Sequence, residues 1–159
     1  MKTLVIGLGN PILGDDGVGW RVAEQVAQKT AERPEVEVDC ASLGGLSLME
    51  RLTGSERVIL VDAIFTGTKP VGTVSQFTLS NLPDLSAGHS ASAHDTSLRN
   101  ALNVGRSIDI LLPRDENVII IAIEAENVYD FSQELSPAVA GAVPQAVKTV
   151  LDLLDSQKL

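Results

Sequence analysis

Short apolar runs alternate along the chain with longer segments in which apolar residues recur at helical spacing. Uninterrupted or nearly uninterrupted apolar runs are typical of strands buried in a parallel sheet. They predict strands at residues 4–6, 57–65 and 117–123, with a shorter strand at 36–38. Apolar residues three and four positions apart predict amphipathic helices. These helices are expected over about 16–30, 46–52 and 96–104, and from Ser136-Pro137 onward.

The order of these elements predicts the fold class. Strands that alternate with helices form a mostly parallel sheet with helices on both faces, which is the doubly wound α/β arrangement. Residues 73–79 alternate between apolar and polar, so we expect them to add one antiparallel edge strand. A long polar loop follows at 80–92. We expect residues 1–159 to form a single domain of this class.

Composition and charge narrow the class of partner. Aromatic residues make up 3% of the chain and apolar residues 44%, so the core must consist mainly of aliphatic side chains. The formal net charge of −9 argues against nucleic acid or an anionic membrane as the main partner. It favours a metal cation or a positively charged peptide, although solubility alone also accounts for an acidic surface.

Cysteine usage and the amino terminus indicate the compartment. Cys40 is the only cysteine, which excludes an intrachain disulfide and a cysteine-rich zinc site. We expect it to be a small buried residue at the end of a strand. The chain opens on MKTLVIG, which predicts a strand rather than a signal peptide, and no apolar run approaches the roughly 20 residues that span a bilayer. These features indicate a protein of the cytoplasm.

The first loop carries the strongest candidate chemistry. Residues 4–19 read LVIGLGNPILGDDGVG, so a glycine-rich turn leads from the first strand to two carboxylates where a helix begins. The unpaired N–H groups of a first helical turn favour acidic side chains. Open α/β sheets also bind their ligands at the carboxyl ends of strands. We expect Asp15 to cap the helix and Asp16 to project its carboxylate outward.

A further aspartate and a histidine stand out later in the chain. Burying an unpaired carboxylate is costly, so Asp62 within the run VILVDAIF indicates a function, with a cap or turn for the next loop as the alternative. His94 directly precedes a predicted helix, whereas His89 lies in a looser polar context. A loop histidine by itself is usually a solvated side chain. Beside two aspartates, His94 becomes the better candidate for a site.

Two carboxylates and an imidazole suit a divalent cation such as nickel or zinc, with positions left open for water or substrate. Asp16, Asp62 and His94 are therefore the candidate metal ligands. The sequence contains neither the H-E-x-x-H motif of helical zinc sites nor the G-x-S-x-G elbow of serine hydrolases.

A nucleotide-binding site is an alternative interpretation of the same loop. Gly7 and Gly9 match the opening of a dinucleotide fingerprint, but Ile12 stands at the position of its third glycine. The neighbouring pair of carboxylates, Asp15 and Asp16, would also repel a pyrophosphate at that helix. The loop therefore fits a cation better than it fits a nucleotide.

Four segments resemble the signature of the hydrogenase maturation endopeptidases, in that family's order along the chain. They are GLGNPILGDDGVG near the amino terminus, VDAI around Asp62, SAHDxxL around His94, and EAE at 124–126 followed by LSP at 135–137. The resemblance covers nearly the whole chain, and the first segment is the most specific of the four.

The resemblance also implies roles for individual residues. The family's nickel-contacting and catalytic residues fall on Asp16, Asp62 and His94, while His89 matches nothing in the family pattern. After the second strand this chain reads DCASLGG from Asp39, where members often read DGGT, so the resemblance does not extend a substrate-recognition role to Asp39.

The family resemblance implies a doubly wound fold and an endopeptidase activity. Its expected substrate is the nickel-loaded precursor of a [NiFe]-hydrogenase large subunit, from which it removes a short carboxy-terminal extension. Nickel supplied by that precursor would serve as the recognition handle, so the purified enzyme need not hold the metal. We expect a monomer with no nucleic-acid or membrane partner.

The same resemblance suggests a mechanism. The metal would polarise the scissile carbonyl or activate a water molecule. A carboxylate of the Asp15–Asp16 pair, with its pKa raised by its acidic neighbour, would accept the proton. Two other classes of function stay open at this point. They are a nucleotide-binding α/β domain and a non-catalytic metallochaperone or adaptor that binds the same precursor without cutting it.

Overall fold

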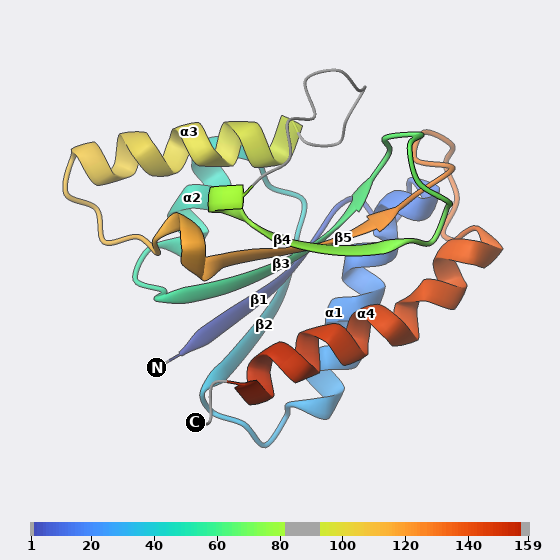
Figure 1. The fold of residues 1–159 in the computed structure, drawn as a ribbon, viewed down its shortest axis with the longest axis horizontal. Coiled ribbons are helices and arrows are strands. Elements are labelled where there is room, and N and C mark those ends of the chain that lie inside the picture. The colour runs from blue at the N-terminus through green and yellow to red at the C-terminus, as the bar shows by residue number, and fades with distance from the viewer. Residues whose placement is uncertain (1, 82–92, 157–159) are drawn as a thin grey trace.

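The computed structural model describes residues 2–81 and 93–156, and for residues 93–97 it describes the backbone only. One five-stranded sheet has the order β2-β1-β3-β5-β4 (Figure 1). Strands β1, β2, β3 and β5 run parallel, and β4 pairs antiparallel with β5 at the edge, as predicted. The strands are β1 (Thr3–Leu8), β2 (Val36–Ala41), β3 (Arg57–Ile64), β4 (Val74–Thr78) and β5 (Val118–Glu124).

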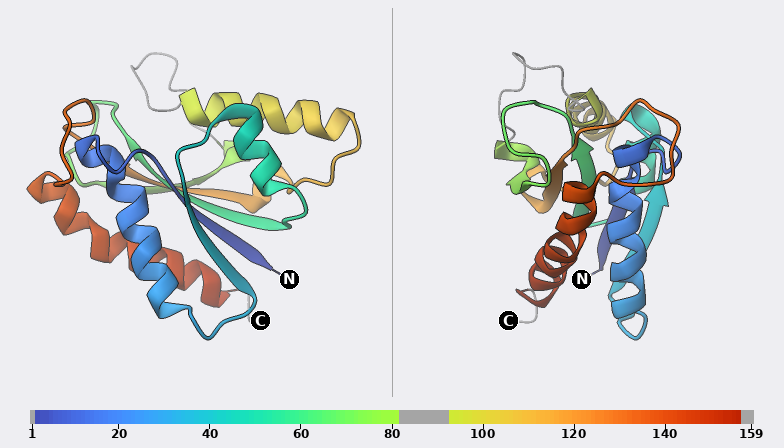
Figure 2. Two further views of the ribbon diagram at one scale, coloured as in Figure 1. Left: turned by 180° about the vertical axis from the view of Figure 1, so that it is seen from behind. Right: turned by 90° about the vertical axis from the view of Figure 1, so that its right-hand side faces the viewer.

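Helices cover both faces of this sheet, which confirms the predicted α/β class (Figures 1 and 2). Helices α1 and α4 pack together on one face, and α2 and α3 pack together on the other. Their bounds are α1 (Val18–Lys29), α2 (Gly45–Leu52), α3 (Ala93–Ser107) and α4 (Pro137–Asp155). In the described part of the chain, no helix combines the length and the hydropathy that a bilayer crossing requires.

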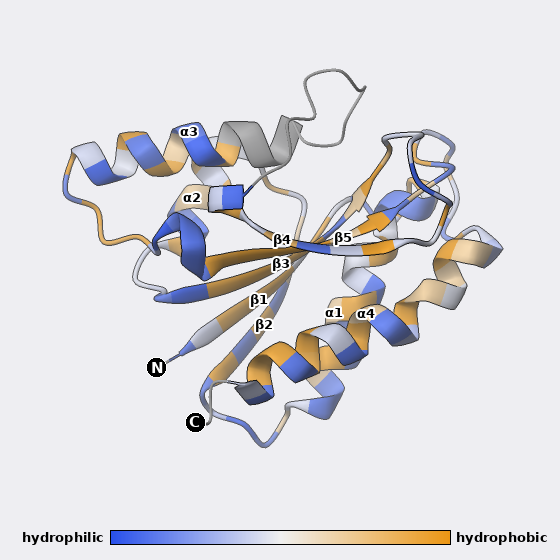
Figure 3. Cartoon of the chain, viewed as in Figure 1, coloured by the Kyte–Doolittle hydropathy of each residue, from blue (hydrophilic) through white to orange (hydrophobic). Residues whose placement is uncertain are grey.

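Alternate residues of the central strands supply two separate cores. From β3, Val61 and Ala63 pack toward α1 and α4, whereas Leu60 and Ile64 pack toward α2 and α3. Every residue of β1, β3 and β5 is buried, which explains the apolar runs in the sequence. Figure 3 shows these strands as the most hydrophobic part of the sheet. The cores are built almost entirely from aliphatic side chains, as the composition predicts.

Several predicted element ends are wrong, each for a local reason. The predicted first turn of the first helix is a separate 3₁₀ helix, η1 (Gly14–Gly17), and α1 begins only at Val18. Strand β2 continues to Ala41, beyond the predicted end at residue 38. The apolar pattern did not predict this extension because β2 is an edge strand, whose half-buried residues need not be apolar. Helix α3 is longer than the predicted 96–104 at both ends. Most of the predicted polar loop at 80–92 lies outside the described residues.

Cys40 is half-buried rather than buried, so this expectation is corrected. It lies on the edge strand β2, where its sulfur is 4.0 Å from the carbonyl oxygen of Trp20. Partial burial, together with the nearby carboxylates of Glu24 and Asp39, raises the pKa of the Cys40 thiol. The group is therefore held in its neutral form.

Glycines allow α1 to approach the sheet unusually closely. A Cβ atom on Gly19 would lie only 2.5 Å from the carbonyl oxygen of Leu8 and would also overlap the carbonyl oxygen of Val61. These two carbonyls belong to the adjacent strands β1 and β3. The glycine at this position therefore sets the distance between the helix and the strands that carry the first loop.

We expect Gly19→Ala to lower the free energy of unfolding by about 2–3 kcal/mol, because the added methyl group forces the helix away from the strands. Gly141→Ala is the matched control, since a Cβ atom added at Gly141 of α4 would meet no other atom within 4 Å. There the substitution should stabilise by about 0.5–1 kcal/mol through helix propensity. Urea unfolding curves of both variants measure the difference, and equal effects would contradict the close approach.

Candidate functional site

The carboxyl ends of the parallel strands gather the candidate residues at one edge of the sheet. The loops that follow β1, β3 and β5 lie together at this edge (Figures 1 and 2). Asp62 lies near the end of β3, where the residue is only 3% exposed. It falls between Leu60 and Ile64, which both pack toward α2 and α3, so Asp62 faces that same layer. The predicted burial of this carboxylate is confirmed.

Asp16 lies in η1, directly before α1, and is half-buried. One of its carboxylate oxygens, Oδ2, accepts a hydrogen bond of 2.8 Å from the backbone N–H of Asn10. This bond ties the side chain back across the loop that follows β1. Its carboxylate is thus held in a defined orientation, and it does not project freely as the sequence suggested.

Asp15 does not cap the first helix, and this prediction is corrected. Neither η1 nor α1 has a side-chain cap, and Asp15 is fully buried. Its carboxylate instead accepts backbone N–H groups of Glu126 at 3.0 Å, Asn127 at 2.9 Å and Ser136 at 2.6 Å. The hydroxyl of Ser136 adds a fourth bond of 2.8 Å. Asp15 therefore closes both ends of the loop between β5 and α4.

Hydrogen bonding also decides the charge of Asp15. Burial by itself raises the pKa of this carboxyl, but the bonds from Asn127, Ser136 and Glu126 more than compensate, and the pKa lies below its ordinary value. The predicted mechanism in which acidic neighbours raise a pKa in the Asp15–Asp16 pair is therefore wrong for Asp15. This carboxylate is ionised and accepts four hydrogen bonds, so its role is structural.

Backbone hydrogen bonds also join the loop after β1 to the loop after β5. The N–H of Asp15 donates to the carbonyl of Asn127, and the N–H of Gly14 donates to the carbonyl of Ser132. Gly14 has a φ of 56°, and a Cβ there would lie 2.6 Å from the Asn127 carbonyl oxygen. Only glycine meets both requirements. The glycine of the GDDG segment thus allows the loop after β1 to seat against the loop after β5.

Glu124 is a buried carboxylate whose individual role the sequence interpretation missed. It ends β5 and accepts the N–H of Thr66 at 2.8 Å, the hydroxyl of Thr66 at 2.5 Å and the N–H of Gly67 at 3.4 Å. It therefore fixes the loop that leaves β3. The signal was present, because Glu124 ends an apolar run of the sequence just as Asp62 interrupts one.

The third predicted ligand, His94, belongs to the first turn of α3, and its side chain lies outside the described residues. Helix α3 covers the face of the sheet toward which Asp62 points. His89 also lies outside the described residues. Among the side chains that are described, no group of three His, Cys, Asp or Glu could hold a metal ion. The convergence of Asp16, Asp62 and His94 on one cation therefore stays a prediction.

We expect Asp15→Ala to lower the free energy of unfolding at pH 7 by about 2–4 kcal/mol, because four donors lose their acceptor. Since the pKa of Asp15 is lowered in the folded protein, its stabilising effect is present above the unfolded pKa and is lost as the pH falls through the folded one. The difference in the free energy of unfolding between wild type and variant should thus become smaller below about pH 4.

Chemical denaturation between pH 3 and pH 7 measures this difference. Asp130→Ala is the matched control, because Asp130 is an exposed carboxylate of the same loop and its removal should change stability by no more than about 0.5 kcal/mol. A difference for Asp15→Ala that is independent of pH would contradict the role of the ionised carboxylate.

Comparison with known proteins identifies the family. The family model described as hydrogenase maturation protease matches residues 20–153. The chain is 26% identical over 155 residues to the hydrogenase expression/formation protein HupD of Rhizobium leguminosarum bv. viciae, which covers 98% of this chain and 75% of that protein.

Solved structures agree with this result. The chain resembles the hydrogenase maturating endopeptidase HybD of E. coli with a TM-score of 0.77 at 23% identity, over 98% of this chain and 93% of that one, a likeness that establishes the fold. It also resembles the [NiFe] hydrogenase maturation protease HybD of Thermococcus kodakarensis with a TM-score of 0.72 at 26% identity, over 96% and 99% of the two chains. The chain therefore belongs to the hydrogenase maturation proteases and is a hydrolase of peptide bonds.

Proposed function

We propose that this protease removes the carboxy-terminal extension from the nickel-loaded precursor of a [NiFe]-hydrogenase large subunit. Membership of the family supports the activity. The observation that carries the proposal for the site is the burial of Asp62 at the carboxyl end of β3, where it faces the layer of α3, whose first turn contains His94. We expect the enzyme to act as a monomer in the cytoplasm.

Asp16, Asp62 and His94 are the proposed contacts to nickel, which arrives as part of the substrate. Carboxylate oxygens and an imidazole nitrogen are suitable ligands for a divalent ion that already has other ligands in the precursor. Asp16 is suited to this role because the hydrogen bond that its Oδ2 accepts from the N–H of Asn10 orients the carboxylate. The enzyme would thereby distinguish a loaded precursor from an empty one.

The proposed chemistry is hydrolysis of the peptide bond beside this ion. Nickel held by the precursor polarises the scissile carbonyl or lowers the pKa of an adjacent water molecule. The water attacks the carbonyl carbon while one of the two site carboxylates, Asp16 or Asp62, accepts its proton; the C–N bond then breaks and the same carboxylate returns that proton to the departing amine nitrogen. Asp15 takes no part in proton transfer, because its carboxylate is buried and engaged by four hydrogen bonds. A metallochaperone would bind the same ion without this proton transfer.

We expect Asp16→Ala and His94→Ala to fold normally and to cleave the nickel-loaded precursor at least about a hundredfold more slowly than wild type. His89→Ala is the matched control, because His89 lies near His94 in the sequence but matches no site segment. Mass spectrometry of the precursor before and after incubation detects loss of the extension. Processing of the precursor by either site variant at the wild-type rate would refute its assignment.

The role of nickel is tested by changing the metal content of the substrate, with the enzyme left unchanged. Wild-type protein should cut the nickel-loaded precursor and leave the nickel-free precursor intact, since the ion is the proposed handle. Equal cleavage of both forms would show that nickel is not recognised. Binding of the loaded precursor without any cleavage would instead favour the adaptor.

A further inference from the structure

An exposed aromatic surface lies beside the candidate site. Tyr129 and Phe131, in the loop between β5 and α4, are 77% and 84% exposed. The ring of Tyr129 meets Phe65, just after β3, edge to face with centroids 6.3 Å apart. Ile12 is exposed as well, and its carbonyl accepts the N–H of Ser132, next to Phe131. We call Ile12, Phe65, Tyr129 and Phe131 the aromatic rim.

This chain has few aromatic residues, and most of them lie in the rim rather than in the core. The sequence contains one tryptophan, one tyrosine and three phenylalanines, and Phe65, Tyr129 and Phe131 all belong to the rim. The cores, by contrast, are aliphatic. Apolar surface in water costs about 25 cal/mol per Å², and neighbouring exposed apolar side chains mark interaction sites. The exposed apolar side chains of the rim therefore indicate a binding surface.

The loop that carries the rim is held in place. Val128 and Leu135 of the same loop pack against the core of α1 and α4. Asp15 binds both ends of the loop, and Ser132 bridges to the loop after β1 at Leu13. A surface that is already ordered loses little conformational entropy when a partner binds. These contacts thus hold the backbone of Tyr129 and Phe131 in place.

The charge around the rim indicates the kind of partner. Glu126, Asp130 and Glu134 alternate with its aromatic residues and are exposed, and within the described part of the chain none of them forms an ion pair. The sequence has no lysine or arginine between Arg114 and Lys148. The one described cation bonded to this loop is Arg21, which donates to the carbonyl of Gln133 at 2.7 Å.

We infer that the aromatic rim and the three carboxylates beside it bind a cationic segment of the precursor near its scissile bond. Lysine and arginine side chains stack on aromatic rings and pair with carboxylates at the same time, which suits a surface that alternates the two. A second copy of this chain is a poor occupant, because it carries the same formal charge of −9. The inference rests on the proposed function and adds the chemical character of the recognised segment.

The first test removes the rings. Tyr129→Ser with Phe131→Ser should weaken binding of the nickel-loaded precursor about tenfold, with the loss in KM rather than in kcat. The matched control is Ile108→Ser with Leu111→Ser, which removes side chains that are 66% and 74% exposed near the end of α3. Biolayer interferometry measures binding, and mass spectrometry measures cleavage. Equal binding by the two double variants would overturn the inference.

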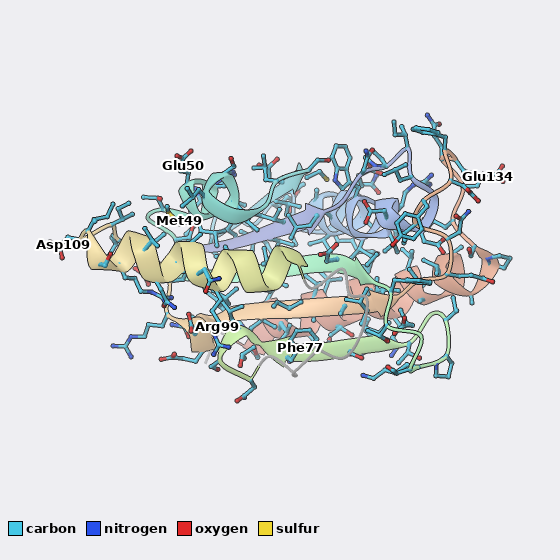
Figure 4. The ribbon with its side chains drawn as sticks, turned by 90° about the horizontal axis from the view of Figure 1, so that it is seen from above. Met49, Glu50, Phe77, Arg99, Asp109 and Glu134 are labelled. Carbon is cyan, nitrogen blue, oxygen red and sulfur yellow. The ribbon has the colours of Figure 1, made fainter. Side chains whose placement is uncertain are left out.

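The second test removes the charges. Glu126→Gln, Asp130→Asn and Glu134→Gln together should weaken binding at low salt about three- to tenfold, and about 0.5 M salt should abolish the difference. The control triple variant, Glu32→Gln, Glu50→Gln and Glu56→Gln, removes the same charge from exposed positions. Figure 4 shows Glu134 at one end of the molecule and Glu50 toward the other. Equal weakening by both triple variants would show an effect of net charge alone and would overturn the inference.

The two measurements separate this inference from the proposed function. Wild-type protein that binds the precursor but leaves it uncut would refute the protease assignment to that substrate, while the binding data still decide the role of the rim. Sedimentation that shows a dimer of wild type, lost in the Tyr129 and Phe131 double variant, would assign the rim to a second copy and overturn the inference.

Discussion

One buried carboxylate holds the functional edge of this molecule together. Asp15 lies in the loop after β1, and its four hydrogen bonds come from residues 111 to 121 positions later in the chain. Without this acceptor, the backbone N–H groups at both ends of the loop between β5 and α4 would lose the bonds that hold the loop in place. The position of Asp16, the next residue, is thereby tied to the geometry of that distant loop.

The parallel register supplies the second constraint. Asp62 pairs with Ala122 and Ile64 with Glu124, so Asp62 and Glu124 lie on the same face at the ends of neighbouring strands. Glu124 is satisfied by Thr66 and Gly67 and shapes the loop that leaves β3. Two buried acids on one face thus differ in role: Glu124 organises the backbone, and Asp62 is the proposed contact to substrate nickel.

The limits of sequence interpretation follow from the same physics. Strand and helix periodicity is local, so the sheet class, the antiparallel edge strand and the burial of Asp62 could all be predicted from the chain. The role of Asp15 could not, because its donors are remote in sequence and a helix start offers a nearer explanation. Cys40 was misjudged for a related reason, since the position of β2 at the sheet edge depends on strand order.

Recognition of a metal ion alone cannot place a peptide bond, because a single ion fixes one point and leaves the chain free to rotate about it. A second contact at a fixed distance removes that freedom. Ile12 and Asp16 lie in one short loop, and the hydrogen bond of Asp16 to Asn10 and that of Ser132 to Ile12 join both residues to the same braced backbone. The rim and Asp16 are therefore joined through the same backbone, and a precursor held at both would present its scissile bond in a defined orientation.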